Sequence, residues 1–312
     1  MEVMIGIDIG TTNIKLAAVS KESELVFTSQ RKNKVLEKND HYNFSGQYIY
    51  QAVLEMLKEV SAADLKIISI GISSLAETVF PVFEPEQESE KDYISMAWYD
   101  KRTESIKAEF FNKIDAADFF EITGLRPQFL YSIFKIKWYY DQQPELFQTG
   151  TKWLTANSFI AYQLTGEMKI DYSLASRTAA LNVKKKEWSD KIFELLPFGS
   201  DLFPDLIECG TSLGGLQESV KAELGLTYDI PVSLSGHDHI CGSYAVAGFR
   251  DNVLLDSMGT AENIMAIVDS SKVNLKELVD ENLSLGVHVI PGKFYINDAF
   301  NYSGGLINSL IS

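Results

Sequence analysis

The chain has 312 residues, of which 46% are hydrophobic and 23% are charged, and its formal net charge is −15. This is the composition of a globular protein, and the chain is long enough for two domains. The negative charge disfavours nucleic acid and anionic membranes as partners. No apolar run is long enough to span a bilayer. The two cysteines, Cys209 and Cys241, lack metal-ligand or redox spacing, so we expect free thiols in a reducing cytoplasm.

The first predicted elements are strands that return on one another, followed by a helix and one further strand. In chain order, strands are expected at residues 4–10, 13–19, 24–31 and 67–72, with helices at 44–60, 153–164 and 188–196. The strand at 67–72 could join the first three in parallel. This order resembles the opening of the ribonuclease-H-like α/β fold of actin, hexokinase and the 70-kDa chaperones.

The first turn has a chemical interpretation. Asp8 ends a strand, and Gly10, Thr11 and Thr12 follow it. Backbone amides and hydroxyls of such a turn can hold phosphate oxygens, while the carboxylate can hold a hydrated Mg²⁺ ion. Lys15 on the same hairpin could reach a phosphate as a point charge. The alternative is an ordinary hairpin with a Gly-Thr turn.

A second copy of this pattern lies near the other end of the chain. Residues 253–264 contain Gly259-Thr260 between two strand-like segments, about 249 residues after Gly10-Thr11. Two copies of a strand, a Gly-Thr turn and a strand suggest a duplicated unit, with a nucleotide held between the copies.

Between the copies, a strand at 230–235 runs through Gly236 and His237 to Asp238, and a helix of small residues is expected at 240–248. An Asp at a strand-to-helix junction lies at the carboxyl edge of a sheet, where open α/β folds bind ligands. Asp238 could therefore accept the proton of an attacking hydroxyl in phosphoryl transfer, next to a helix N-terminus that favours negative charge. The alternative is a plain helix N-cap.

Taken together, the motifs resemble those of the FGGY carbohydrate kinases, and they occur in the same order over essentially the whole chain. They are residues 8–12, 72–78, 98–103, 123–125 with 135–138, 171–178, 236–238 and 257–260. The resemblance implies a ribonuclease-H-like fold with a partial second copy. It also implies a sugar-binding domain over residues 1–248 and the beginning of a nucleotide-binding domain over 249–312.

The resemblance further implies an ATP- and Mg²⁺-dependent kinase that phosphorylates a small sugar or polyol. Asp238 would be the general base in the substrate site, Asp8 would help to hold Mg²⁺, and Glu77 and Trp98 would line the sugar site. The remaining implied residues face the phosphates: Thr11, Thr12, Lys15, Gly259 and Thr260. Asp100 and Arg102 are expected to form a supporting ion pair, and Arg177 is expected to be structural.

The sugar is not identified by the sequence. Glycerol kinases carry Arg-Glu where this chain has Ala76-Glu77, and xylulose kinases usually carry Met-His there, so neither pattern fits. His237 and His239 flank Asp238; a His before this Asp also occurs in rhamnulose and fuculose kinases, and the roles of both histidines stay open. His288 has no recognisable partner in the sequence.

Family members continue into a full second domain with a Gly-rich adenosine loop, whereas this sequence stops at Ser312, in a predicted helix that begins near Ser303. We therefore expect a truncated form with weak ATP binding, little turnover and exposed apolar surface that favours dimerisation. The alternative is a non-catalytic, sugar-binding regulator derived from a kinase.

Overall fold

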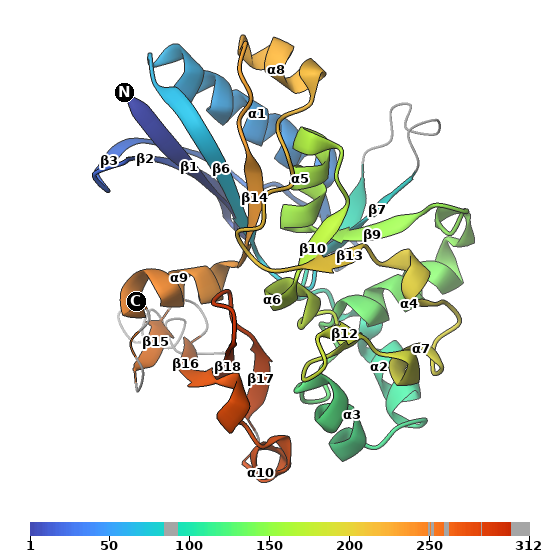
Figure 1. Ribbon diagram of the computed structural model, residues 1–312. Coiled ribbons are helices and arrows are strands. Elements are labelled where there is room, and N and C mark those ends of the chain that lie inside the picture. Colours follow the sequence, from blue (N-terminus) through green and yellow to red (C-terminus); the bar gives the residue numbers. More distant parts are fainter. Residues whose placement is uncertain (84–92, 249, 251–252, 259–261, 282, 301–312) are drawn as a thin grey trace, which may run out of the picture.

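The computed structural model describes residues 1–83, 93–248, 250, 253–258, 262–281 and 283–300 (Figure 1). A five-stranded sheet has the order β14-β6-β1-β2-β3. Its strands are β1 (Glu2–Ile9), β2 (Asn13–Ser20), β3 (Leu25–Lys32), β6 (Lys66–Ser74) and β14 (Val232–His237). Strands β1, β2 and β3 form an antiparallel meander, while β6 and β14 extend the sheet in parallel with β1. The predicted order of strands is confirmed.

Helices α1 (Gly46–Ala62) and α5 (Ala156–Thr165) pack on this sheet, α1 on β2 and β3 and α5 on β6 and β14. The Ser45 side chain caps α1 by accepting a hydrogen bond from the Tyr48 N–H, and the apolar positions of the helix join the core of the sheet. A Cβ at Gly46 would lie 2.9 Å from the ring of Phe159, so glycine allows α1 to approach α5 closely.

The predicted helix at 153–164 is partly wrong. Residues Lys152–Thr155 form strand β9, which pairs antiparallel with β7 (Val79–Val82), and helix α5 begins only at Ala156. Strand and helix are both buried, so their continuous apolar pattern does not mark the boundary between them. The predicted helix at 188–196 is likewise shorter, because Trp188 ends strand β12 (Glu187–Trp188) and α7 covers only Asp190–Phe193.

A helical region rich in aromatic side chains lies beside the sheet (Figure 1). Its helices are α2 (Glu104–Phe111), α3 (Ala116–Thr123), α4 (Ser132–Gln142) and α6 (Tyr172–Ala175). Helix α8 covers Glu218–Leu224. The smaller strands of this first part are β4 (Val35–Lys38), β5 (His41–Ser45), β8 (Ile94–Met96), β10 (Lys169–Asp171), β11 (Leu181–Asn182) and β13 (Asp205–Ile207). Within the described ranges, no helix is both long and apolar enough to cross a membrane.

A second, four-stranded sheet follows helix α9 (Asp238–Ala247) and has the order β15-β16-β18-β17. It consists of β15 (Leu254–Met258), β16 (Glu262–Asp269), β17 (Ser284–Val287) and β18 (Lys293–Phe300), with helix α10 (Leu275–Asp280) before β17. Strands β15, β16 and β18 form an antiparallel series like β1, β2 and β3, as a duplicated unit predicts. The predicted turn residues Gly259 and Thr260, and the predicted helix near Ser303, lie outside the described residues.

The second sheet packs against the helical region of the first part. The Leu285 N–H donates a hydrogen bond to the Gly124 carbonyl oxygen (2.7 Å), and Leu285 shares an apolar cluster with Phe120 of α3. An ion pair joins Arg126 Nη2 to Asp298 Oδ1 at 2.7 Å. This packing brings one face of the second sheet opposite residues from the first part.

Candidate active site

A cavity of about 270 Å³ lies where the two parts meet. Three parallel strands of the central sheet end at it: Thr11 follows β1, Glu77 follows β6 and Asp238 follows β14. This is the carboxyl edge of the sheet, the usual position of ligand sites in open α/β folds. Trp98 lines the same cavity, so four of the residues proposed from the sequence are brought together.

Asp238 is the first residue of α9, and a quarter of its side chain remains exposed. Burial raises the pKa of its carboxyl to about 6, the nearby Asp8 charge acts in the same direction, and His239 opposes them. Its Oδ1 accepts a hydrogen bond from the His239 N–H (2.7 Å), and His237 Nε2 lies 3.2 Å from the same oxygen. A carboxyl with a raised pKa at a helix N-terminus is suited to accept a proton near neutral pH.

His237 is a neutral partner of this carboxylate. Burial, together with the charges of His239 and Arg177, lowers the pKa of His237 well below its ordinary value. With Nε2 facing Asp238, the proton belongs on Nε2, and the buried Nδ1 has no hydrogen-bond partner among the described residues. The imidazole therefore orients Asp238 without adding a positive charge.

Gly236 fixes the backbone immediately before this pair. Its φ of 110° lies in the region that favours glycine, and the pairing of β14 with β6 shifts register there. A Cβ at Gly236 would lie 2.6 Å from Ser173 Oγ and 2.7 Å from Val289 Cγ1. Ser173 Oγ in turn accepts a hydrogen bond from the His237 N–H (2.9 Å). This close packing positions Asp238.

Glu77 and Arg177 form a buried ion pair on the cavity wall. Arg177 Nε and Nη2 lie 2.7 and 2.5 Å from Glu77 Oε1. Both contacts are to Oε1, so Oε2 can accept hydrogen bonds from a ligand. Glu77 has a φ of 64°, a strained conformation for a residue with a side chain, and such strain is concentrated at functional sites. Arg177, predicted to be structural, thus lines the cavity itself.

Trp98 and Thr11 connect the predicted sugar wall to the first hairpin, because Trp98 Nε1 donates a hydrogen bond to Thr11 Oγ1 (3.0 Å). Beneath the wall, the buried Lys135 donates to the carbonyl oxygens of Leu130 and Trp98. Burial lowers the pKa of Lys135 to about 7. The sequence showed Lys135 only as part of a motif; the signal for its role was a lysine within an apolar, aromatic helix.

The expected ion pair of Asp100 and Arg102 is present. Arg102 Nε and Nη2 donate to Asp100 Oδ1 and Oδ2 at 2.8 and 2.9 Å, and Asp100 is fully buried. Asp100 also accepts a hydrogen bond from the Tyr42 N–H (2.7 Å). The pair therefore supports the loop that carries Trp98.

The first hairpin carries a carboxylate, two hydroxyls and a lysine, and of these four residues only Thr11 lines the cavity. Burial raises the pKa of Asp8, while Lys15, its cross-strand neighbour, and a hydrogen bond from Ser73 oppose the shift. Thr12 and Lys15 are exposed. A Cβ at Gly10 would lie 2.9 Å from the Asn13 carbonyl oxygen, so the turn requires glycine.

A second cavity, of about 380 Å³, adjoins the first. Four residues line both cavities: Asp238, His239, Asn263 and Met265. Asp238 therefore lies at the junction of two spaces, one large enough for a small acceptor and one open to a second reactant.

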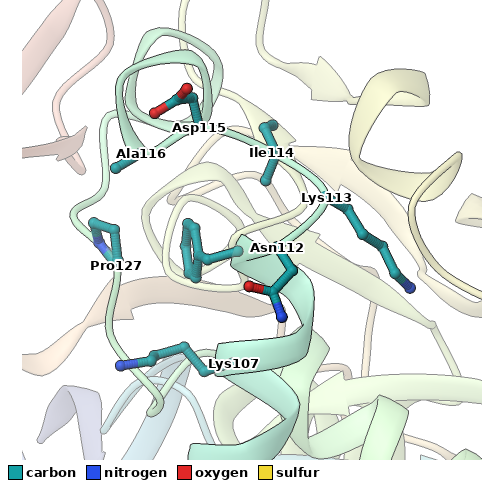
Figure 2. Close-up of a pocket in the computed structure, with 8 residues that line it drawn as sticks. Lys107, Asn112, Lys113, Ile114, Asp115, Ala116 and Pro127 are labelled. Carbon is teal, nitrogen blue, oxygen red and sulfur yellow. The ribbon is translucent and has the colours of Figure 1, made fainter.

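A larger cavity, of about 570 Å³, lies on the helical region (Figure 2). Figure 2 shows Lys107, Asn112, Lys113 and Asp115 around it. None of the residues proposed from the sequence lines it, and Lys113, which follows α2, pairs with Glu109 of that helix. The candidate site is therefore the cavity at Asp238.

The sequence interpretation missed the contribution of the second sheet to this cavity. Five of its residues line the cavity: Asn263, Met265, Ser284, Tyr295 and Asn297. Arg126 and Gln128, from the loop after α3, line it as well. Strands β17 and β18 were not predicted, and cavity residues from a separate sheet have no signature in local sequence.

His288 also has a partner that the sequence did not reveal. Its Nδ1 accepts a hydrogen bond from the Ile290 N–H (3.0 Å), and its Nε2 lies 3.1 Å from Ser243 Oγ in α9. Burial lowers the pKa of His288 to about 4, so the ring is neutral and connects the second sheet to the helix that begins at Asp238.

Comparisons with known proteins agree with the resemblance and the fold. Residues 3–244 match the model of the FGGY family of carbohydrate kinases, N-terminal domain. L-fuculokinase of Escherichia coli K12 is 28% identical over 278 residues, which are 86% of this chain and 58% of that protein. Glycerol kinase of Thermococcus gammatolerans is 28% identical over 84% of this chain and 53% of its own length. The chain thus spans a little over half the length of these relatives.

Among solved structures, ligand-bound xylulose kinase from Lactobacillus acidophilus superposes with a TM-score of 0.88. The match covers 99% of this chain and 62% of that one, at 21% identity. It confirms the predicted ribonuclease-H-like fold class.

Proposed function

Because the chain belongs to the FGGY family of carbohydrate kinases, we propose that it phosphorylates a hydroxyl of a small sugar or polyol, with ATP as the donor. The observation that carries this proposal is the position of Asp238 at the junction of two cavities, with its pKa raised to about 6. The cavity of about 270 Å³ is at the small end of ligand sites, in keeping with a small acceptor.

Asp238 acts as the general base in this proposal. As the acceptor oxygen forms its bond to the γ-phosphorus, the hydroxyl proton passes to the Asp238 carboxylate, and the bond from the γ-phosphorus to the β,γ-bridging oxygen breaks to release ADP. His237 Nε2–H orients the carboxylate. The N-terminus of α9 favours the negative charge that develops at this point.

The first hairpin is compatible with a bound Mg²⁺–nucleotide. Asp8 would help to hold the ion, and Thr11, Thr12 and Lys15 would face the phosphates. The family resemblance assigns the same role to Gly259 and Thr260, which lie outside the described residues. When bound, Mg²⁺ neutralises charge on the phosphates. The described residues contain no cluster of three or more metal ligands. A kinase Mg²⁺ site usually takes only one or two carboxylates, with phosphates and water completing the shell.

Glu77 and Trp98 would bind the sugar, the carboxylate through Oε2 and the indole as an apolar wall. A boundary between domains at residues 248 and 249 is supported by the change from the central sheet, which ends with β14, to the second sheet, which begins with β15. Two free cysteines fit a reducing compartment such as the cytoplasm.

The test combines sugar binding with turnover. Calorimetry on the chain is run with pentuloses, deoxyhexuloses, glycerol and gluconate, and ADP release is followed with ATP and Mg²⁺ present. We expect one sugar to bind and to be phosphorylated slowly, in keeping with the little turnover expected from the sequence, and Asp238→Asn to abolish ADP release while sugar binding persists.

Sugar binding without ADP release, in protein shown to bind ATP, would instead favour the non-catalytic regulator. Absence of binding to every sugar in the panel would contradict both functions.

A further inference from the structure

One face of the second sheet forms a wall of the sugar cavity. In the strand register, Asn297 of β18 lies between Met265 of β16 and Ser284 of β17, and all three line the cavity. Tyr295, two residues earlier on β18, lines it as well, as expected because alternate residues of a strand share a face. The wall is therefore a continuous sheet surface with a fixed spacing of side chains.

Tyr295 is held in this wall by the glycine opposite it. Gly286 pairs with Tyr295 across the strands, and a Cβ at Gly286 would lie 2.3 Å from the Tyr295 hydroxyl oxygen. The ring thus lies directly over Gly286. This contact limits the conformations open to the wall next to Asn297.

Asn297 has a polar atom with no partner. Its Nδ2 donates a hydrogen bond to Asn263 Oδ1 (3.3 Å), whereas its own Oδ1 is buried and has no hydrogen-bond partner among the described residues. Buried polar atoms in folded proteins are nearly always satisfied, so an unsatisfied one calls for an explanation. Because Asn297 lines the cavity while its Oδ1 is shielded, a turn of the amide toward the cavity would let a donor there supply the missing bond.

The charges around the cavity favour a hydroxyl as that donor. Arg126 is paired with Asp298, and Arg177 with Glu77, so both guanidinium groups on the wall are neutralised. A carboxylate or phosphate group would bring another acceptor to Asn297 Oδ1, whereas a hydroxyl can donate to it.

The position of Asn297 indicates that the hydroxyl that it would contact is not the hydroxyl that reacts. Asn263 and Met265 line both cavities, together with Asp238, whereas Asn297 and Ser284 line only the first. Asn297 therefore belongs to the part of the sugar cavity that is not shared with the second cavity.

We propose that Asn297 is a specificity-determining residue that accepts a hydrogen bond, through Oδ1, from a sugar hydroxyl other than the one phosphorylated. This inference rests on the proposed function. It assigns part of the sugar site to the second sheet, which the sequence associated only with the nucleotide.

The test is a binding cycle by calorimetry. The sugar that binds the wild-type chain most tightly is compared with its monodeoxy analogues, each lacking one hydroxyl, in wild type and in Asn297→Leu. We expect the substitution to weaken binding of the parent sugar about tenfold. For one analogue, wild type should already bind about tenfold more weakly than it binds the parent sugar, and Asn297→Leu should have little further effect.

Asn112→Leu, in the cavity of Figure 2, is the matched control and should bind all the sugars as wild type does. Circular dichroism checks folding, and Asn297→Ser replaces the leucine variant if that variant does not fold. Equal losses of affinity for the parent sugar and every analogue, or no loss at all, would overturn the role of Asn297. A wild-type chain that binds no sugar would contradict the proposed function, and the inference with it.

Discussion

At the scale of single residues, the candidate site depends on a carboxyl group held in an unfavourable environment. Burial and the neighbouring Asp8 raise the pKa of Asp238 to about 6, and the neutral His237 contributes a hydrogen-bond donor rather than a charge. This raised pKa suits the role proposed for Asp238, because a base with an ordinary carboxyl pKa would accept a proton less readily.

The raised pKa has a defined consequence for stability. The pKa of this carboxyl is higher in the folded state than its ordinary value of 3.8. Its contribution to the free energy of unfolding is therefore fully present below pH 3.8 and is lost as the pH rises through about 6. At pH 7.5 the ionised Asp238 therefore costs up to about 3 kcal/mol. We expect Asp238→Asn to raise the Tm by a few degrees at pH 7.5 and by less at pH 4.5, measured by calorimetry.

The proposed activity, in contrast to the stability, should require the ionised form of Asp238. In the wild type, kcat/KM should fall below about pH 6 as Asp238 becomes protonated, while the asparagine variant should be inactive at every pH. An asparagine variant that is less stable than wild type at pH 7.5 would contradict the unfavourable environment inferred for this carboxylate.

At the scale of elements, the junction between β14 and α9 determines where Asp238, the proposed base, lies. Gly236, the last residue but one of β14, has a positive φ that favours glycine, and the contact with Ser173 and Val289 leaves no space for a side chain. Helix α9 is also held near its middle by the contact of His288 with Ser243. The helix that carries Asp238 is thus fixed from both parts of the molecule.

We expect Gly236→Ala to lower the free energy of unfolding by about 1–3 kcal/mol, because alanine is strained at this φ and its Cβ would collide with Ser173. Urea unfolding measures this loss, and sugar binding should weaken in parallel. Gly6→Ala is the matched control, since a Cβ there meets nothing within 4 Å. Equal stability of the two variants would show that the junction adapts to a side chain.

At the scale of the whole molecule, the cavity exists because the second sheet packs against the helical region. The backbone bond between Leu285 and Gly124 and the ion pair between Arg126 and Asp298 cross this contact. Loosening it should separate the Asn297 wall from the Glu77 wall without unfolding the central sheet.

Arg126→Met tests whether the second sheet can loosen while the central sheet stays folded. Losing a partly buried ion pair should cost about 1 kcal/mol, so amide exchange in β17 and β18 should become about fivefold faster while β1 and β6 stay protected. Hydrogen exchange with mass spectrometry measures both regions. Arg31→Met, which removes contacts with Glu55 and Glu59 instead, should leave β17 and β18 unchanged. Faster exchange throughout the central sheet in Arg126→Met would contradict separate behaviour of the two parts.

The sequence alone determined the parts of this protein that depend on local pattern. Alternating apolar residues predicted the central strands, and the strand-to-helix junction placed Asp238 at the carboxyl edge of the sheet. The ordered motifs indicated the family. These features are local because strand period, turn chemistry and helix start signals are each encoded within a few residues.

Only the tertiary structure decided how the cavity is built. Asn297, Tyr295 and Arg126 are distant in sequence from Glu77 and meet it through the packing of the second sheet, which no local pattern encodes. The pairing of Arg177 with Glu77, the neutral state of His237 and the raised pKa of Asp238 likewise depend on burial, because the solvation of a charge is a property of the folded surroundings.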